Sequence, residues 1–219
     1  MSLKKLNKKI LKIGFLFDKN NRNIYRHFKK YYYKKFKHVK ILWDVNNLKK
    51  FDILFILNFT KKIPLTKINI EKFNLVIHES SLPQGKGFAP LQWQILEKKK
   101  NIVFSMININ NEIDSGPILM RSKLKLSGFE LYDEIRYLQS EKTFEMIEKF
   151  LKNYPNINSL KQKGKSTYYK KRTPKDSELN INKSIVSQFN KLRIANNNEW
   201  PAFFYYKNKK YILKIFKNE

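Results

Sequence analysis

The sequence predicts an α/β protein built on a doubly wound, mostly parallel sheet, with a small C-terminal extension made of a helix and a β-hairpin. Three observations support this prediction. Short, continuous apolar runs bounded by polar residues or Pro are typical of strands buried on both faces of a sheet. These runs alternate with amphipathic stretches at helical spacing. The chain has 219 residues, enough for one large domain with an appendage.

The first part of the chain alternates strands with one helix. Residues 12–17 (KIGFLF) predict the first buried strand, and residues 22–36 predict an amphipathic helix. Three more apolar runs follow, at 38–43, 52–58 and 74–77. Each is short and bounded by polar residues, so each is expected to be a buried strand of the parallel sheet.

The next part continues the alternation. Pro90 is expected in the first turn of a helix over 89–98, where the missing N–H of Pro costs nothing. Strands are expected at 102–109 and 117–126, and a long amphipathic helix over 129–153. The sequence therefore predicts a main domain that spans residues 1–153.

Residues 154–219 are predicted to form the C-terminal extension. A polar stretch, 156–180, is expected to be a linker or an extended segment, followed by a helix over 183–194. The last runs, 201–216, predict a β-hairpin with a turn near Lys207. Strict alternation makes both hairpin faces apolar, so we expect burial against the main domain or against a second copy of the chain, as a homodimer. One face is predicted to carry Phe203, Tyr205, Tyr211, Leu213 and Ile215, and the other Phe204, Tyr206, Ile212 and Phe216.

Composition excludes several classes of function. The chain has no Cys, so it cannot carry a disulfide framework, a Cys-ligated zinc or a thiol nucleophile, and its three His leave little room for a metal site. The net charge is +28, but Lys is spread evenly, which indicates a solvated coat more than a nucleic-acid-reading surface. No run reaches the ~18 apolar residues of a membrane span. The basic start at Lys4–Lys9 imitates a signal peptide, but Lys12 interrupts its apolar run, so a cytoplasmic protein is expected.

Two strand ends carry side chains suited to chemistry. His78 follows the apolar run 74–77 and precedes a loop with Gly85 and Gly87, and Asp114 follows the run 102–109. Ligands bind at the carboxyl ends of parallel strands, and a neighbouring His and Asp suit the acylation of an amine. Each residue alone also has an ordinary structural interpretation, a satisfied strand-end His and an Asp-Ser-Gly turn.

The segments HESSLPQGKGFAPLQWQIL and MININNEIDSGPIL resemble the 10-formyltetrahydrofolate-dependent formyltransferases. That family includes methionyl-tRNA, glycinamide ribonucleotide and nucleotide-sugar formyltransferases. A later segment, 168–184, is similar to the family's R-x-P-x-D region. The matching residues are His78, Ser80, Leu82, Pro83, Gly87, Ala89, Pro90, Trp93, Ile95, Asp114 and Gly116.

The resemblance implies transfer of a formyl group from 10-formyltetrahydrofolate to the primary amine of a nucleotide-linked amino-dideoxy sugar, without a metal. It implies catalytic roles for His78 and Asp114. The family's Asn, two residues before the His, is replaced by Val76, and Asn58 is our candidate for the lost hydrogen-bond donor. The implied folate-contacting residues are Phe59, Ile63, Leu82, Asn110 and Ile113, and the implied substrate-contacting residues are Ser80, Gln84, Gly85, Lys86, Gly87 and Arg172.

Two alternatives stay open. Methionyl-tRNA formyltransferase is favoured by the positive charge, although about 66 residues after residue 153 are few for a separate tRNA-binding domain. The other alternative is a non-catalytic relative that binds folate or a nucleotide, in which Val76 marks a lost active site.

Overall fold

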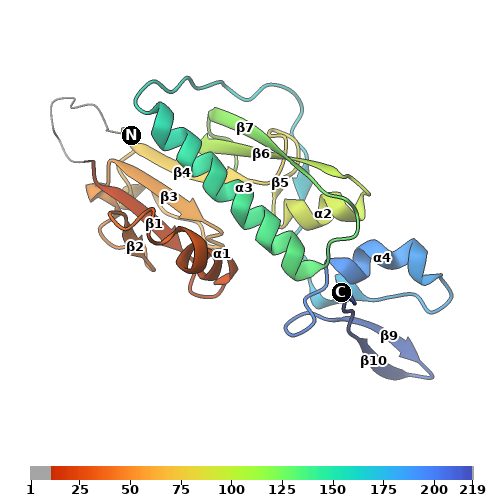
Figure 1. The fold of residues 1–219 in the computed structure, drawn as a ribbon. Coiled ribbons are helices and arrows are strands. Elements are labelled where there is room, and N and C mark those ends of the chain that lie inside the picture. The colour runs from red at the N-terminus through yellow and green to blue at the C-terminus, as the bar shows by residue number, and fades with distance from the viewer. Residues whose placement is uncertain (1–10, 219) are drawn as a thin grey trace. The chain divides into compact units, whose positions relative to one another are not determined.

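The computed structural model describes residues 11–218 of the chain (Figure 1). The basic start at Lys4–Lys9 lies outside these residues. The described chain divides into two compact units. One contains the residues up to Val76 together with Asn108–Asn111, and the other contains Ile77–Ile107 and the residues from Glu112 onward.

Four parallel strands form the sheet of the first unit, in the order β2-β1-β3-β4. Every residue of β1 and β3 is buried, which explains why these strands appear in the sequence as continuous apolar runs. Phe15 lies opposite Ile41 on one side and Phe55 on the other. The expected strands are confirmed as β1 (Ile13–Phe17), β2 (Lys40–Leu42), β3 (Ile53–Leu57) and β4 (Phe73–His78).

The α-helix expected at 22–36 is shorter than predicted, and part of it is a π-helix. Helix α1 (Asn23–His27) continues as a π-helical turn, Phe28–Tyr32, in which five-residue hydrogen bonds replace the α-helical ones. Phe28 is fully buried and packs edge-on against Phe15, with 5.5 Å between the ring centres. Two short 3-10 turns complete this unit, at Leu48–Lys50 and Leu65–Lys67.

The second unit contains an antiparallel pair, β6 (Asn101–Asn108) and β7 (Ile118–Lys125), with Asn108 itself in the first unit. Hydrogen bonds between neighbouring strands give the order β2-β1-β3-β4-β6-β7. The sheet is mostly parallel, as predicted. Helix α2 (Pro90–Leu96) begins with Pro at its first position. The long helix α3 (Tyr132–Asn153) packs against β7 and ends before Pro155, also as predicted.

The linker at 156–180 is not a free connection, which differs from the simplest interpretation of its polar sequence. Leu160 forms a bridge with Ile118 through two backbone hydrogen bonds of 2.8 Å. Further on, β8 (Tyr168–Tyr169) pairs with β5 (Lys86–Gly87), and a 3-10 turn follows at Pro174–Ser177. The linker is held by hydrogen bonds between backbone groups. Such bonds need no apolar side chains, so the hydrophobic pattern of the sequence cannot predict them.

The C-terminal part contains the expected helix and hairpin, as α4 (Ile185–Arg193), β9 (Ala202–Tyr206) and β10 (Lys209–Leu213). The predicted faces are wrong. Phe204 lies opposite Tyr211, with their rings stacked at 5.4 Å, and Phe203 lies opposite Ile212. Directly opposed residues share a face, so Tyr211 belongs with Phe204 and not with Phe203.

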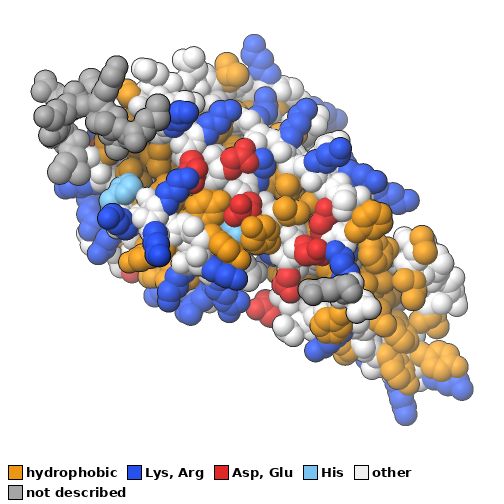
Figure 2. Space-filling view, viewed as in Figure 1, with side chains coloured by type: hydrophobic (Ala, Val, Ile, Leu, Met, Phe, Trp, Pro, Cys, Tyr) orange, Lys and Arg blue, Asp and Glu red, His pale blue; other side chains and the backbone are white. Residues whose placement is uncertain are grey.

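The prediction that both faces of the hairpin are buried is also wrong for a single copy of the chain. Ala202 and Phe203 are buried, but Tyr205, Tyr206 and Ile212 are about half exposed, at 49%, 50% and 52%. Figure 2 shows this apolar surface over β9 and β10, while Lys and Arg side chains are spread over the visible face. The distributed lysines agree with the expected solvated coat.

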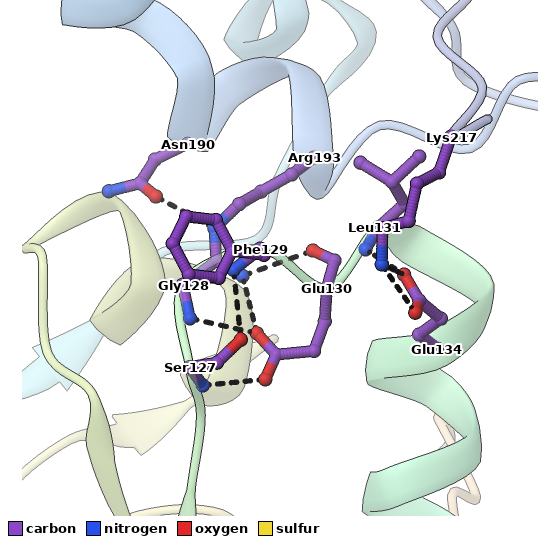
Figure 3. A network of polar contacts seen from close by, with 9 residues as sticks. All are labelled: Ser127, Gly128, Phe129, Glu130, Leu131, Glu134, Asn190, Arg193 and Lys217. Atoms are coloured by element: carbon purple, nitrogen blue, oxygen red, sulfur yellow. Dashed lines mark hydrogen bonds and ion pairs between the residues drawn. The ribbon is translucent and has the colours of Figure 1, made fainter. Parts of the chain in front are cut away.

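A buried ion pair anchors α4 to the turn that precedes α3 (Figure 3). The Glu130 carboxylate accepts hydrogen bonds from the backbone N–H groups of Ser127, at 2.6 Å, and Gly128, at 3.0 Å. Arg193, which is 2% exposed, lies 3.3 Å from the same carboxylate and also donates to the Glu130 carbonyl. Burial alone would raise the pKa of Glu130, but the hydrogen bonds from these amides outweigh it and lower the pKa.

We expect Glu130→Gln to lower the melting temperature at pH 7, because the variant leaves Arg193 buried without its charged partner. The folded-state pKa of Glu130 lies below 4.5, so its stabilisation is present above that pH and is lost as the pH falls through the folded pKa. Thermal melts of both proteins from pH 7 to pH 3 should therefore converge. Glu71→Gln, at an exposed position, is the control and should melt like the parent. A gap that does not narrow as the pH falls would contradict the prediction.

Candidate functional site

His78 ends strand β4, and its imidazole is buried, with 6% of the residue exposed. Its Nε2 lies 2.8 Å from the Gly85 carbonyl oxygen, and its Nδ1 lies 3.6 Å from Oδ1 of Asp114. Both ring nitrogens therefore face oxygen acceptors, which fixes the plane of the ring. A neutral imidazole carries one N–H and donates to only one of these oxygens, so its other nitrogen keeps a lone pair that can accept a proton.

Asp114 is held by two groups besides His78. Its Oδ2 accepts a hydrogen bond of 2.9 Å from the Gly87 N–H, while Gln162 Nε2 donates to the backbone carbonyls of Asp114 and Gly116 at 2.8 Å each. The backbone of Asp114 is left-handed, with φ of 53°, a conformation that Asp and Asn tolerate better than most residues. The structure thus brings His78 and Asp114 together in the second unit.

The loop that joins them needs both of its glycines. A Cβ on Gly87 would lie 2.5 Å from the Tyr169 carbonyl oxygen, and one on Gly85 would lie 2.9 Å from the Tyr169 ring. Both glycines also have positive φ, 71° at Gly85 and 94° at Gly87. The Gly85 N–H donates to Thr167 Oγ1 at 2.8 Å, so the linker is fastened directly to this loop.

Trp93 of α2 fastens the same segment from the side. Its indole N–H donates to the Lys170 carbonyl at 2.8 Å, and its ring stacks on Tyr169 at 6.3 Å and 12°. Burial raises the pKa of Tyr169, and its hydrogen bond to the Glu97 carboxylate raises it further, which keeps the phenol a donor. The family's Trp therefore has a structural explanation in this chain.

Lys86 lies between the two glycines and is 5% exposed. Its Nζ donates to Ser115 Oγ at 2.6 Å, and Ser115 Oγ donates in turn to the Ile113 carbonyl at 3.1 Å. The Tyr168 ring centre lies 5.8 Å from Nζ. Among residues 11–218, Lys86 has no carboxylate partner.

The two residues that follow His78, Glu79 and Ser80, are polar and buried. Ser80 is 2% exposed, and within the described chain its Oγ has no hydrogen-bond partner. Glu79 is buried and accepts a short hydrogen bond from Gln139 Nε2. Leu82 is fully buried, with its carbonyl bound to Arg121 at 2.7 Å, whereas Gln84 is exposed.

Arg172 lies farther along the linker and is half-buried. Burial lowers the pKa of its guanidinium, and the nearby Arg136 lowers it further, against the opposing effect of Asp176. Its contact with Ser177 Oγ is long, at 3.5 Å, and its buried Nε has no hydrogen-bond partner within residues 11–218.

The other predicted residues lie mainly in the first unit. Asn58 follows β3 with φ of 50° and is half-buried. Phe59, Ile63 and Val76 pack against one apolar cluster built around Leu54 and Ile56. A cavity of about 440 Å³ opens in this unit, lined by Lys62, Ile63, Pro64, Leu65, Asn110 and Asn111. Ile113 belongs to the second unit and is 58% exposed.

Sequence reasoning missed the residues that hold the site from the linker, namely Thr167, Tyr169 and Gln162. A polar segment with isolated Thr, Tyr and Gln carries no pattern that predicts such contacts. Ser115 was part of the Asp-Ser-Gly motif, but nothing in its spacing indicates that it accepts from Lys86. Within residues 11–218 no group of three or more His, Asp or Glu side chains is arranged to hold a metal, and no helix is long and apolar enough to cross a membrane.

The mostly parallel sheet, with the His–Asp pair at the end of one of its strands, agrees with the formyltransferase family that the sequence motifs resemble. The chain is 31% identical over 180 residues to the methionyl-tRNA formyltransferase of Rickettsia prowazekii, an alignment that covers 80% of this chain and 58% of the relative. The chain thus spans little more than half the length of the relatives it matches. No model of a protein family matches it.

Solved structures share the fold. A methionyl-tRNA formyltransferase from Clostridium thermocellum superposes with a TM-score of 0.75 at 21% identity, covering 95% of this chain and 94% of that one. A 4-N formyltransferase from Francisella tularensis gives a TM-score of 0.67 at 18% identity, covering 95% and 98%. The sequence relatives and the shared fold together support the predicted formyltransferase family.

We expect Gly87→Ala to destabilise the protein and to reduce its activity, because the new Cβ would meet a backbone oxygen at 2.5 Å. Overpacking of this kind costs about 1–3 kcal/mol. Gly164→Ala is the matched control, since Gly164 has a similar φ of 103° but open space around the added carbon. Chemical denaturation should show the larger loss for Gly87→Ala. Equal losses would mean that backbone conformation alone matters.

Proposed function

We propose that this chain transfers a formyl group from 10-formyltetrahydrofolate to the primary amine of a nucleotide-linked amino sugar in the cytoplasm. The observation that carries the proposal is the His78–Asp114 pair, with 3.6 Å between Nδ1 and Oδ1, fixed by a glycine loop at the end of a buried strand. Residues 1–153 would form the catalytic domain and residues 154–219 the extension that fastens its loops.

The proposed reaction divides its work among few residues. The neutral amine attacks the formyl carbon, and His78 accepts or passes on the proton that the amine loses. Asp114 orients the imidazole and stabilises its charged form. Asn58 is a predicted neutral donor to the oxygen on which negative charge develops.

The formyl donor fits the chemistry of the first unit. A cavity of about 440 Å³ combines apolar walls at Ile63, Pro64 and Leu65 with the amides of Asn110 and Asn111. Flat heterocycles bind in such pockets through stacking on apolar walls and hydrogen bonds to a few amides. We assign this cavity to the folate, with Phe59 of the same unit as a further predicted contact.

The amino-sugar acceptor would contact the loop after His78. Ser80 offers a buried hydroxyl without a partner within the described chain, and Arg172 offers positive charge for the phosphates of a nucleotide. Gln84 is exposed at the same loop, and Gly85 and Gly87 allow close approach to the backbone. A sugar N-formyltransferase from Shewanella sp. shares the fold, so the fold is compatible with this acceptor class.

We expect His78→Asn and Asp114→Asn to lower formyl transfer by about 10²–10⁴ while leaving the melting temperature nearly unchanged. Asn suits the left-handed backbone at position 114, so this substitution removes the charge without straining the turn. Steady-state assays with UDP- and dTDP-linked amino sugars measure the effect. Asp44→Asn, at an exposed position, is the control. Folate binding without any transfer by the parent protein would instead identify a non-catalytic relative.

Methionyl-tRNA is the second candidate acceptor, favoured by the sequence relatives and by the net charge of +28. Charge neutralisation of tRNA phosphates makes such binding strongly salt-dependent. Formylation assays with charged initiator tRNA, run beside the amino sugars, decide between the two. Transfer to the tRNA at near-physiological salt, with none to any sugar, would replace the sugar proposal.

We further propose a homodimer through the hairpin, since its half-exposed apolar side chains form the patch seen in Figure 2. Tyr211→Lys with Ile212→Lys is expected to give a monomer in light scattering. A doubly charged variant at Lys183→Glu and Lys163→Glu is the control, because both positions are exposed and lie outside the hairpin. A parent protein that is already monomeric would contradict the proposal.

A further inference from the structure

Lys86 differs from every other basic residue of the described chain. Only Lys86 and Arg193 are buried among the Lys and Arg residues of 11–218, at 5% and 2% exposed. Arg193 is matched by the Glu130 carboxylate at 3.3 Å, whereas the only hydrogen-bond partner of Lys86 Nζ in this part of the chain is a neutral hydroxyl. A buried cation without a carboxylate is costly, and proteins keep such groups mainly where they act.

The position of Lys86 points to the reacting atoms. The residue before it binds the catalytic ring, since the Gly85 carbonyl lies 2.8 Å from His78 Nε2. The residue after it binds the catalytic carboxylate, since the Gly87 N–H lies 2.9 Å from Asp114 Oδ2. Lys86 is thus rigidly bracketed by the two contacts that hold the His–Asp pair.

The Lys86 side chain also has unused donor capacity. A lysine has three N–H donors, and Ser115 Oγ accepts one of them at 2.6 Å. Ser115 donates its own proton to the Ile113 carbonyl, so it acts toward Lys86 only as an acceptor and fixes the direction of Nζ. The remaining donors have no partner within residues 11–218.

We propose that Lys86 is a catalytic residue of the formyl transfer, which donates a hydrogen bond to the oxygen that becomes negatively charged when the amine attacks. In this step the nitrogen lone pair forms the new C–N bond and the C=O π pair moves to oxygen, opposite the Lys86 charge. When the C=O bond re-forms, the bond to the donor nitrogen breaks, that nitrogen keeps the pair, and the proton lost by the amine ends there. Lys86 stays protonated throughout.

The inference rests on the proposed formyl transfer but not on the identity of the acceptor. A charged donor that acts only in the transition state lowers the barrier without changing substrate binding. The same lysine used to hold a phosphate of the substrate would instead change the acceptor's KM. The two roles are therefore separable by kinetics.

The test compares Lys86→Met, Lys86→Arg and the parent, with Lys165→Met as an exposed linker control. We expect Lys86→Met to lower kcat by about 10²–10³, with the acceptor's KM changed less than about threefold, and Lys86→Arg to recover part of the loss. Because Met fills the same volume without a buried charge, Lys86→Met should melt at the same or a higher temperature than the parent.

Three outcomes would overturn the inference. A raised KM with unchanged kcat would make Lys86 a ground-state anchor for an anionic group. A melting temperature that falls together with kcat would make it a structural residue. Activity of Lys86→Met equal to that of the control would remove it from the reaction. A parent protein that formylates neither sugars nor tRNA would refute the proposed function itself, which the parent assay detects before any variant is compared.

Discussion

The contact between the Gly85–Gly87 loop and β8 controls the geometry of the site. Gly87 approaches the Tyr169 carbonyl so closely that no side chain fits, and this approach lets its N–H reach the Asp114 carboxylate. The neighbouring Gly85 carbonyl orients His78 by the same means. His78 and Asp114, the proposed catalytic pair, are therefore aligned by backbone groups, which have fewer degrees of freedom than side chains and keep their positions more accurately.

Polar contacts of the linker extend this control to the Asp114 turn. Gln162 binds the carbonyls on both sides of Ser115, and Leu160 pairs with the start of β7. At the far end, Arg193 and Glu130 join α4 to the turn before α3. The second unit thus holds these loops and its C-terminal helix with several separate, part-buried polar contacts.

Elements whose pattern is set by apolar burial could be predicted from the sequence. The runs that became β1, β3 and β4 are buried on both faces, and α3 carries a helical apolar stripe, so each was found within a few residues. The pairing at Tyr168–Tyr169 could not be found, because two residues give no period and their partners are backbone atoms. The hairpin faces were misassigned because a register depends on the turn, Lys207–Asn208, and not on alternation alone.

The candidate site divides in the same way. His78 and Asp114 follow predictable strands and could be named from motifs, whereas Lys86 could be named only as a substrate contact that the family resemblance implied. Its burial and its neutral partner depend on where Ser115 lies in three dimensions. Gln162 carried no signal at all, since its role depends on two carbonyls that come together only in the fold.

The fastening of the linker has a consequence for how the chain matures. The residues that align His78 and Asp114 are synthesised about 90 positions after the histidine itself, since Thr167 and Tyr169 follow it by 89 and 91 residues. A ribosome therefore releases most of the sheet before its reactive loops can take their final positions. A chain that ends between α3 and β8 would lack the contacts of Thr167 and Tyr169. Its His78 and Asp114 would therefore lose the alignment that the full chain gives them.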